Sequence, residues 1–418
     1  PFSNMEKGVG GMRFKTTLYS ILGIITFLIS ACASTSLPPP AETIVPTLSG
    51  PSNISNTPQP DAPAWRSPSQ PITRENVANI ELLGRLDFSG TPSTIFTYTF
   101  SPDGTRIVGL NNTHVVGWDL ITGQFIINNT HRNGMYLFYG VDKTDLFVVQ
   151  RDGMVAIYDA DRGISSEDFI GHERFNGIAT YDNVNGWLAL GGSDGTIHVW
   201  DTLERTALAV ISAHQGEITQ LAFSPDGTRL VSSGADNNNY VWDWRNRQQI
   251  HTMSNNGVPT IRIAYHPSGK RVAISTNEVI TIWDTASGEF IHGLPTGIAG
   301  SENLLLFSHD GRFLVNGGAI PDMMVWSGDD DNRFLAFLPR MGDARIAATF
   351  SPDSNLLLTS KFEGETVLWD MTQIRENTVV RANINPATQR VVFTEWSPDG
   401  FTILFFDAGG SIYAWGLP

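Results

Sequence analysis

Residues 214–243 read HQGEITQLAFSPDGTRLVSSGADNNNYVWD, and this stretch decides the fold. Apolar and polar residues alternate from Ile218 to Phe223, which is typical of a half-buried strand. Pro225, Asp226 and Gly227 then supply the chemistry of a tight turn, because proline pre-sets its backbone and glycine tolerates positive φ. The stretch predicts three short antiparallel strands, at 218–223, 229–233 and 240–243, with a fourth strand of the same unit type at 206–212.

The same unit recurs through residues 76–418. The Ser-Pro-Asp-Gly turn occurs at 101–104, 224–227 and 397–400, with degenerate copies at 266–269, 308–311 and 351–354. An aromatic residue, usually followed by aspartate, marks the end of a strand every 40 to 46 residues, at Trp118, Tyr158, Trp200, Trp242, Trp283, Trp326, Trp369 and Trp415. Eight markers predict eight units, and no stretch of this region has a helical period over three turns.

These residues resemble the WD-repeat family, and the resemblance covers residues 76–418. It implies an all-β fold, a propeller of radially arranged four-stranded blades. The count gives eight blades, although seven is the more usual number in the family. The resemblance also implies a structural tetrad of His, Ser or Thr, Asp and Trp in each blade. The fourth unit matches it fully and the third lacks only the hydroxyl, so the residues carried over are His214, Ser232, Asp236, Trp242, His172, Asp194 and Trp200. The second unit has His131 and Asp152, with Tyr158 in place of tryptophan.

The two ends of the propeller region predict how the ring closes. Residues 80–88 read as a strand without a unit of its own, and the last unit ends at Trp415 with only three strands. The N-terminal strand can therefore supply the missing outer strand of the eighth blade. Such closure would leave no unpaired edge at the seam.

The N-terminal residues predict a targeting signal followed by a linker. Residues 1–31 read as a leader and signal peptide with an apolar run from Leu18 to Ile29, and Ile29-Ser30-Ala31-Cys32 resembles the lipobox of bacterial lipoproteins, which implies lipidation of Cys32. An ordinary secretory signal or an uncleaved anchor helix remains the alternative. Residues 32–75 contain ten prolines and little apolar periodicity, so they read as a disordered linker in which Trp65 is a stray exposed aromatic.

Composition excludes several classes of function. The chain of 418 residues has a net charge of −15, which argues against a nucleic-acid binder. Its single cysteine rules out an intramolecular disulfide framework and a cysteine-based zinc site. There is no Gly-x-Ser-x-Gly elbow and no phosphate-binding loop. The acidic run at 329–331 reads as an exposed turn. We therefore expect a protein without catalytic activity, metal or cofactor.

The remaining function is presentation of a surface. Propellers bind partners on the face formed by the loops between each outer strand and the next inner strand, and exposed Arg, Phe and Met residues are typical of interface centres. The repeat places in these loops His131, Arg132, Arg174, Phe175, Gln215, Asn256, Arg340, Met341 and Asn385. The sequence predicts a membrane-anchored, extracytoplasmic bacterial lipoprotein whose propeller scaffolds a protein or peptide partner at the cell envelope. A glycan-binding or small-ligand-binding propeller, and a propeller hydrolase, are the alternatives.

Overall fold

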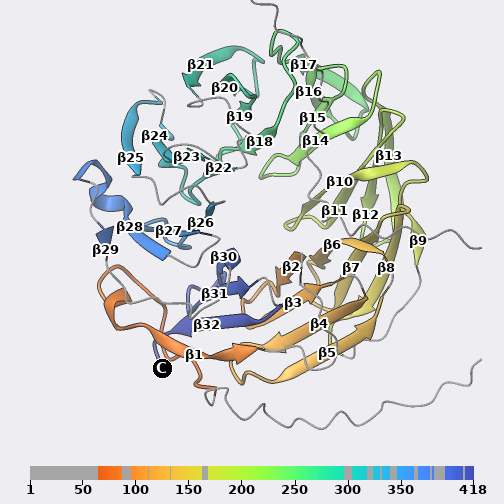
Figure 1. Ribbon diagram of the computed structural model, residues 1–418. Coiled ribbons are helices and arrows are strands. Elements are labelled where there is room, and N and C mark those ends of the chain that lie inside the picture. The colour runs from red at the N-terminus through yellow and green to blue at the C-terminus, as the bar shows by residue number, and fades with distance from the viewer. Residues whose placement is uncertain are drawn as a thin grey trace, which may run out of the picture. The chain divides into compact units, whose positions relative to one another are not determined.

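The blades form a ring, as the ribbon diagram in Figure 1 shows. This computed structural model describes residues 65–86, 95, 97–111, 113–131, 133–161, 168–295, 304–317, 323–329, 332–338, 346–361, 366–376, 379–380, 391–407 and 410–418. Within these ranges the chain forms eight antiparallel sheets of four strands each. The prediction of an eight-bladed, all-β propeller is confirmed.

The strands follow one another from the ring centre outward in seven of the blades. The first four blades in chain order are β2 (Thr97–Phe100), β3 (Arg106–Leu110), β4 (His114–Asp119), β5 (Phe125–Thr130); β6 (Gly134–Tyr139), β7 (Asp145–Gln150), β8 (Met154–Asp159), β9 (Phe169–Ile170); β10 (Phe175–Asp182), β11 (Trp187–Gly192), β12 (Thr196–Asp201), β13 (Thr206–Ser212); and β14 (Ile218–Phe223), β15 (Leu230–Gly234), β16 (Asn239–Asp243), β17 (Gln248–Thr252).

The next three blades have the same order. They are β18 (Arg262–Tyr265), β19 (Arg271–Ser275), β20 (Val279–Asp284), β21 (Phe290–Pro295); β22 (Leu304–Phe307), β23 (Phe313–Gly317), β24 (Met323–Ser327), β25 (Phe334–Leu338); and β26 (Ile346–Phe350), β27 (Leu356–Lys361), β28 (Thr366–Asp370), β29 (Val379–Val380). The eighth blade joins β1 (Glu81–Leu86) to β30 (Val391–Trp396), β31 (Thr402–Asp407) and β32 (Ile412–Gly416). Two short 3-10 helices, η1 (Val77–Asn79) and η2 (Met371–Glu376), complete the described elements.

The recurring turn is built by its own side chains. In the fourth blade the Ser224 hydroxyl donates to Asp226 Oδ1 at 2.6 Å, and the backbone N–H of Arg229 donates to Ser224 Oγ at 2.9 Å. Gly227 has φ +67°, which a residue with a Cβ rarely adopts. Ser101, Ser351 and Ser397 make the same pair of hydrogen bonds in other blades. The turn thus fixes the register of the first two strands.

The aspartate of the Trp-Asp dipeptide also has a local role. The Asp201 carboxylate accepts hydrogen bonds from the backbone N–H groups of Leu203 and Glu204, both at 3.0 Å. Asp119 and Asp284 do the same in their blades. This aspartate begins the turn into the outer strand, and the pairing with that strand shifts register at the tryptophan.

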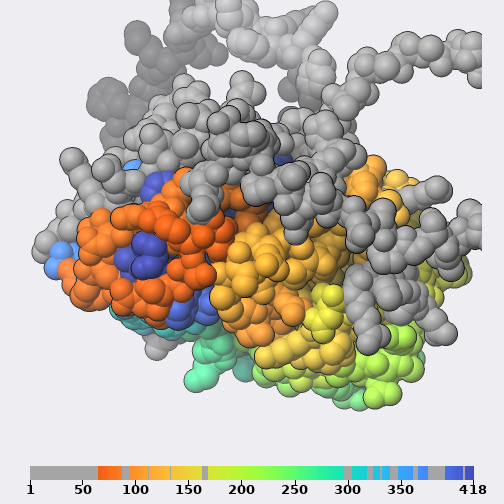
Figure 2. All heavy atoms as spheres, turned by 90° about the horizontal axis from the view of Figure 1, so that it is seen from below, coloured from red at the N-terminus to blue at the C-terminus, as the bar shows by residue number. Residues whose placement is uncertain are grey.

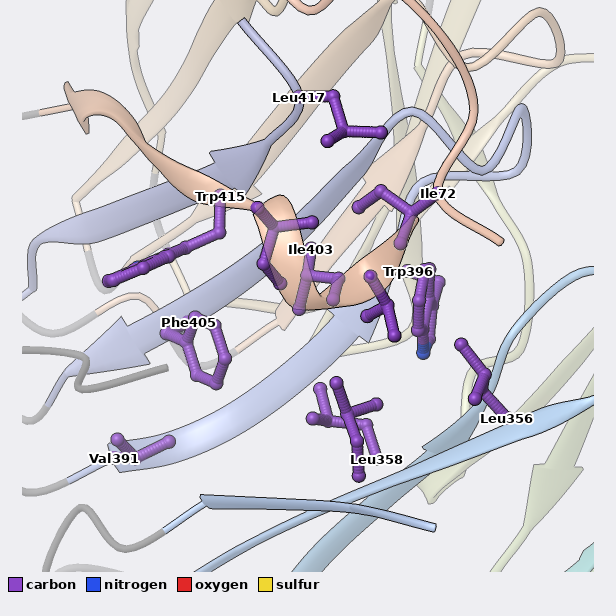
Figure 3. Close-up of a cluster of buried hydrophobic side chains, with 12 residues drawn as sticks. Ile72, Leu356, Leu358, Val391, Trp396, Ile403, Phe405, Trp415 and Leu417 are labelled. Carbon is purple, nitrogen blue, oxygen red and sulfur yellow. The ribbon is translucent and has the colours of Figure 1, made fainter. Parts of the chain in front are cut away.

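The predicted closure of the ring is confirmed. β1 pairs with β32 in antiparallel register, with Leu82 opposite Trp415 and Leu86 opposite Ile412. Figure 2 shows the N-terminal residues, in orange, around the blue C-terminal residues on the outer surface. Ile72 contributes to the buried cluster that joins the seventh and eighth blades, beside Trp396 and Leu417 (Figure 3).

The structure differs from the linker interpretation at residues 65–75. The backbone N–H of Arg66 donates to Leu83 O, and that of Ser69 donates to Leu417 O, both at 2.8 Å. The Trp65 ring lies against two glycines, Gly84 and Gly123, at distances that leave no room for a Cβ at either position. Its Nε1 donates to Ile121 O at 3.0 Å. Trp65 is therefore half-buried in a strap of residues 65–72 across the seam, and it is not a stray aromatic.

The predictions for the N-terminal signal, the lipobox and Cys32 lie outside the described residues. In the part of the chain that the structure describes, no helix has the length and apolar character needed to cross a bilayer.

Candidate functional site

The histidine network of the fourth blade links the core of the blade to one end of the sheet. Trp242 Nε1 donates to Ser232 Oγ at 2.9 Å, Ser232 Oγ lies 2.7 Å from His214 Nε2, and His214 Nδ1 lies 3.0 Å from Asp236 Oδ1. Burial lowers the pKa of His214, although Asp236 opposes the shift. A neutral imidazole donates from Nδ1 to the carboxylate and accepts from the serine at Nε2, so the donors run in one direction from Trp242 to Asp236.

This network also holds the following loop in place. The second oxygen of Asp236 accepts from the backbone N–H of Gln215 at 3.0 Å, and Oδ1 also accepts from that of Asn238 at 3.1 Å. Partial burial opposes the shift, but these hydrogen bonds and the His214 ring lower the pKa of Asp236, so the carboxylate is ionised at neutral pH. The side chain of Gln215 is exposed. The tetrad thus fixes the backbone of an exposed loop residue.

The third blade uses its corresponding residues differently. His172 Nδ1 accepts from the backbone N–H of Arg174 at 3.1 Å, and His172 Nε2 bonds to Thr196 Oγ1, which donates to Asp194 at 2.6 Å. Trp200 Nε1 donates to the carbonyl of Gly171 at 2.8 Å. Leu190 offers no hydroxyl, so the tryptophan bonds to the backbone and Thr196 bridges the histidine to the aspartate. His172, Asp194 and Trp200 are close together but do not form one direct chain.

In the second blade, His131 was predicted on the binding face but is buried. His131 is only 6% exposed, and its Nδ1 lies 3.1 Å from the Tyr158 hydroxyl. Burial lowers the pKa of His131. The repeat that placed this residue in a loop also places its ring against the Tyr158 marker, so His131 is an internal residue.

Four of the remaining candidates lie at one end of the sheets, which we call the loop face. It is formed in the described chain by residues 170–175, 213–217 and 253–261, each connecting the outer strand of one blade to the inner strand of the next. Arg174, Gln215 and Asn256 are exposed there, while Phe175 is half-buried and packs in the cluster between the second and third blades. Other predicted members lie outside the described residues: Arg132, Arg340, Met341 and Asn385.

One polar cluster on the innermost strands has no motif in the sequence. Tyr98 of the first blade donates to Glu395 Oε2 of the eighth, and Thr349 of the seventh donates to Glu395 Oε1, both at 2.8 Å. Burial raises the pKa of Glu395, although these two hydrogen bonds oppose the shift. One carboxyl group therefore joins three blades beside the seam. Only a repeat alignment that compared inner-strand polar residues across blades could have suggested it.

The marker tryptophans bear on the glycan-binding alternative. A glycan site would need exposed tryptophans, yet the markers Trp118, Trp242, Trp283, Trp326, Trp369 and Trp415 are all buried. Within the described ranges no group of three His, Cys, Asp or Glu side chains is placed to hold a metal ion.

The chain is similar to several curated WD-repeat proteins over parts of their length. It is 28% identical over 157 residues to WD repeat-containing protein 90 of Xenopus tropicalis, covering 35% of this chain and 8% of the relative. It is 33% identical over 84 residues to transducin beta-like protein 3 of Bos taurus, which is 20% of this chain and 10% of that protein. It is 47% identical over 45 residues to U3 small nucleolar RNA-associated protein 12 of Saccharomyces cerevisiae, 11% of this chain and 5% of the relative. The matches thus span a tenth or less of these relatives.

The fold also resembles that of a solved structure. The crystal structure of the computationally designed Ika8 protein matches with a TM-score of 0.65 and 21% identity, covering 79% of this chain and 98% of that one. At this identity the likeness concerns the fold alone.

The comparisons contradict the predicted location at a bacterial envelope. The three relatives are eukaryotic, and the name of the yeast protein associates it with a small nucleolar RNA. The family described as "Nucleolar protein 10-like, N-terminal domain" matches residues 85–350. The family description and the name of the yeast protein refer to nucleolar proteins and contradict the predicted extracytoplasmic lipoprotein. The matched residues cover more than half of the chain, so the chain belongs to the nucleolar protein 10-like N-terminal β-propeller family.

Proposed function

We propose that the propeller is a non-enzymatic scaffold that binds a protein or peptide partner on its loop face. The observation that carries this proposal is the way the third and fourth blades fix exposed residues. The His172 ring accepts from the backbone of Arg174, and the Asp236 carboxylate accepts from the backbone of Gln215. Their side chains therefore project from loops that are already ordered, which reduces the entropy lost on binding.

The chemistry of the face favours a protein partner. Arg174, Gln215 and Asn256 offer hydrogen-bonding groups of mixed type, as the rim of a protein interface does. The chain's net charge of −15 disfavours a polyanion such as RNA. The WD-repeat relatives support a role in assembly rather than catalysis.

Site-specific photo-crosslinking tests this function. A photo-reactive amino acid is placed at Gln215, at Asn256 and, as a control, at Glu289, which is exposed at the opposite end of the fifth blade. We expect the two loop-face positions to capture the same protein in cells, and the control position to leave it uncaptured. Capture at all three positions with equal yield, or none at the loop face, would contradict the proposal.

A further inference from the structure

The opposite end of the sheets carries a second exposed feature, which we call the turn face. In the third and fourth blades it comprises the turns 183–186, 202–205, 224–228 and 244–247. These two blades are neighbours in the ring (Figure 1). Arg245 lies here, two residues after the end of β16, and its side chain is exposed. The strand directions put it at the far end of the fourth blade from Gln215.

Two tryptophans hold the Arg245 guanidinium in position. Its central carbon lies 4.0 Å from the ring centre of Trp187 and 4.6 Å from that of Trp244. The two indole rings are 5.0 Å apart at an interplanar angle of 63°, so the cation lies over both rings. Stacking of this kind fixes a side chain that otherwise samples many rotamers.

The aromatic platform itself is rigid. Trp244 is 1% exposed, and its Nε1 donates to the carbonyl of Gly227 at 2.8 Å. Trp187 begins β11 and pairs in register with Asp182 on one side and Asp201 on the other. A Cβ at Gly227 would lie 2.5 Å from the Trp187 ring, so the two blades are in close contact at this point.

The polar edge of Arg245 has no acceptor among the described residues. Its neighbour Asp243 accepts from Asn246, through the backbone N–H at 3.1 Å and the side-chain amide at 2.8 Å. These hydrogen bonds, and after them the charge of Arg245, lower the pKa of Asp243. Asp226, on the adjacent turn, accepts from Ser224 and Thr228. The nearby carboxylates are thus already bonded within their own turns, and the guanidinium donors remain available to a ligand.

The neighbouring blade carries two exposed aliphatic side chains on its turns of this face. Val184 is 67% exposed and Leu203 is 48% exposed. Asn185 connects their blade to the Arg245 blade, since its Nδ2 lies 3.5 Å from Asp226 O. A Cβ built on Gly186 would lie 3.2 Å from Val141 Cγ2 of the second blade and 3.6 Å from Leu203 Cγ, so Leu203 lies on the side of the second blade, whereas Val184 lies on the turn that leads into Trp187. The turn face here combines a fixed cation with exposed apolar surface.

We propose that Arg245 is the centre of a docking site for a peptide segment of a partner protein that carries one carboxylate next to an aliphatic side chain. The planar guanidinium would donate two parallel hydrogen bonds to the carboxylate, and Val184, on the turn that leads into Trp187, would cover the apolar group. The site is independent of the proposed loop-face function, because the two faces lie at opposite ends of the sheets.

The surroundings select this ligand over a nucleic-acid phosphate. Binding of a phosphate backbone needs several basic residues along a track. Arg205 is paired with Asp145, and Arg229 donates to the carbonyl of Thr285. That leaves the exposed Arg247 beside Arg245, which is too few basic residues for such a track. The net charge of −15 also opposes a run of acidic residues in the ligand. A single carboxylate in an apolar context satisfies both conditions.

The experiment selects binders from a displayed library of random peptides on the purified full chain, after depletion on the Arg245→Gln variant. Enriched peptides are synthesised with and without replacement of the carboxylate by its amide, and their affinities are measured by calorimetry. Arg247→Gln is the matched control, because Arg247 is an exposed arginine of the same turn that touches neither indole ring. Arg245→Lys keeps the charge but loses the planar fork.

We expect Arg245→Gln to weaken binding at least tenfold, Arg245→Lys to weaken it severalfold, and Arg247→Gln to change it less than twofold. The amide peptide should bind wild type and Arg245→Gln with similar weak affinity, because the two changes remove the same interaction. Failure to enrich any peptide, equal binding to Arg245→Gln, or displacement of the peptide by a short single-stranded RNA would overturn the proposal. Melting curves of each variant confirm that it is folded.

Discussion

The fourth and eighth blades reach the same four-stranded architecture by different means. The fourth is continuous in sequence and contains the polar chain from Trp242 to Asp236. The eighth joins the two ends of the propeller region, and Phe405 occupies the register position that Ser232 has in the fourth. The Nε1 of Trp415 has no hydrogen-bond partner among the described residues. A blade therefore does not need the tetrad to form.

Other blades show what the tryptophan requires. Trp326 donates to the Asn316 side chain at 2.7 Å and Trp369 to the Thr359 hydroxyl at 2.9 Å, in blades without the histidine pair. In these blades and in the fourth, the acceptor is a short polar side chain two residues after the residue that pairs with the tryptophan across the two strands. The histidine and aspartate add an ordered loop, as at Gln215, rather than the blade itself.

The largest effect should come from removing the N-terminal strand of the eighth blade. A chain beginning at residue 87 lacks Ile72, Leu83 and Leu86, all of them buried. Loss of several such side chains, at roughly 1.5–3 kcal/mol each, should lower the melting temperature by more than about 10 °C or prevent folding.

A chain beginning at residue 65 is the control for this truncation. Thermal unfolding followed by circular dichroism makes the comparison. Melting temperatures within about 2 °C of each other would show that closure of the ring adds little stability.

Breaking the tetrad of the fourth blade should have the next largest effect. Ser232→Ala removes the acceptor of Trp242 and the partner of His214, leaving buried polar groups unpaired. We expect a loss of about 1–3 kcal/mol in the free energy of unfolding, measured in denaturant. Ser212→Ala, at an exposed position of β13, should change it by less than about 0.5 kcal/mol. Equal effects of the two substitutions would mean that the tetrad is not stabilising.

Substitution of Trp65 in the strap over the eighth blade should lower the free energy of unfolding by a smaller amount. Trp65→Ala removes the contacts with Gly84 and Gly123 and the hydrogen bond to Ile121, but the ring is only half-buried. We expect a loss of about 1–2 kcal/mol, below the cost of truncating a fully buried tryptophan. Ile121→Ala, on the turn that the strap contacts, is the control and should have little effect on the unfolding free energy.

The His214 network of the fourth blade and Glu395 of the eighth should make the free energy of unfolding depend on pH in opposite directions. The lowered pKa of His214 gives stability that is present above pH 6.5 and is lost as pH falls below it. The raised pKa of Glu395 gives stability that is complete below pH 4.5 and is lost as pH rises through the folded-state value. Relative to wild type, His214→Gln should therefore gain stability in acid and Glu395→Gln should lose it. Denaturant unfolding between pH 4.5 and 8 measures both, and parallel profiles for the two variants would contradict the prediction.

Repetition explains why the sequence predicts the blades so well. The turn serine and aspartate, the marker tryptophan and the following aspartate each act within one unit, so their spacing carries the structural information. The unpaired strand before the first unit likewise identified the closure, since only the eighth unit lacked a strand. Local chemistry that recurs from blade to blade leaves few alternatives.

Contacts between neighbouring blades could not be predicted from the sequence. Trp65 packs on Gly84 and Gly123, and no sequence motif marks either glycine as the contact of a distant aromatic ring. Trp187 and Trp244 meet at Arg245 only because two blades touch. The prediction of the binding face also required each side chain to be exposed, and the position of His131 in the repeat does not show that its side chain is buried. Such features depend on three-dimensional packing between repeats and not on the pattern within one.

The seam has a consequence for synthesis on the ribosome. The Ser69 hydroxyl bonds to Leu417 O, 348 residues later in the chain. At about 5–20 residues per second, the strap and β1 would wait roughly 20–70 s for their partner strand. During that time the leucines of β1 are unpaired, and the Glu81 and Arg85 charges among them would discourage pairing with other nascent chains. Residues 412–417 thus supply the partners of a strap and a strand that are synthesised long before them.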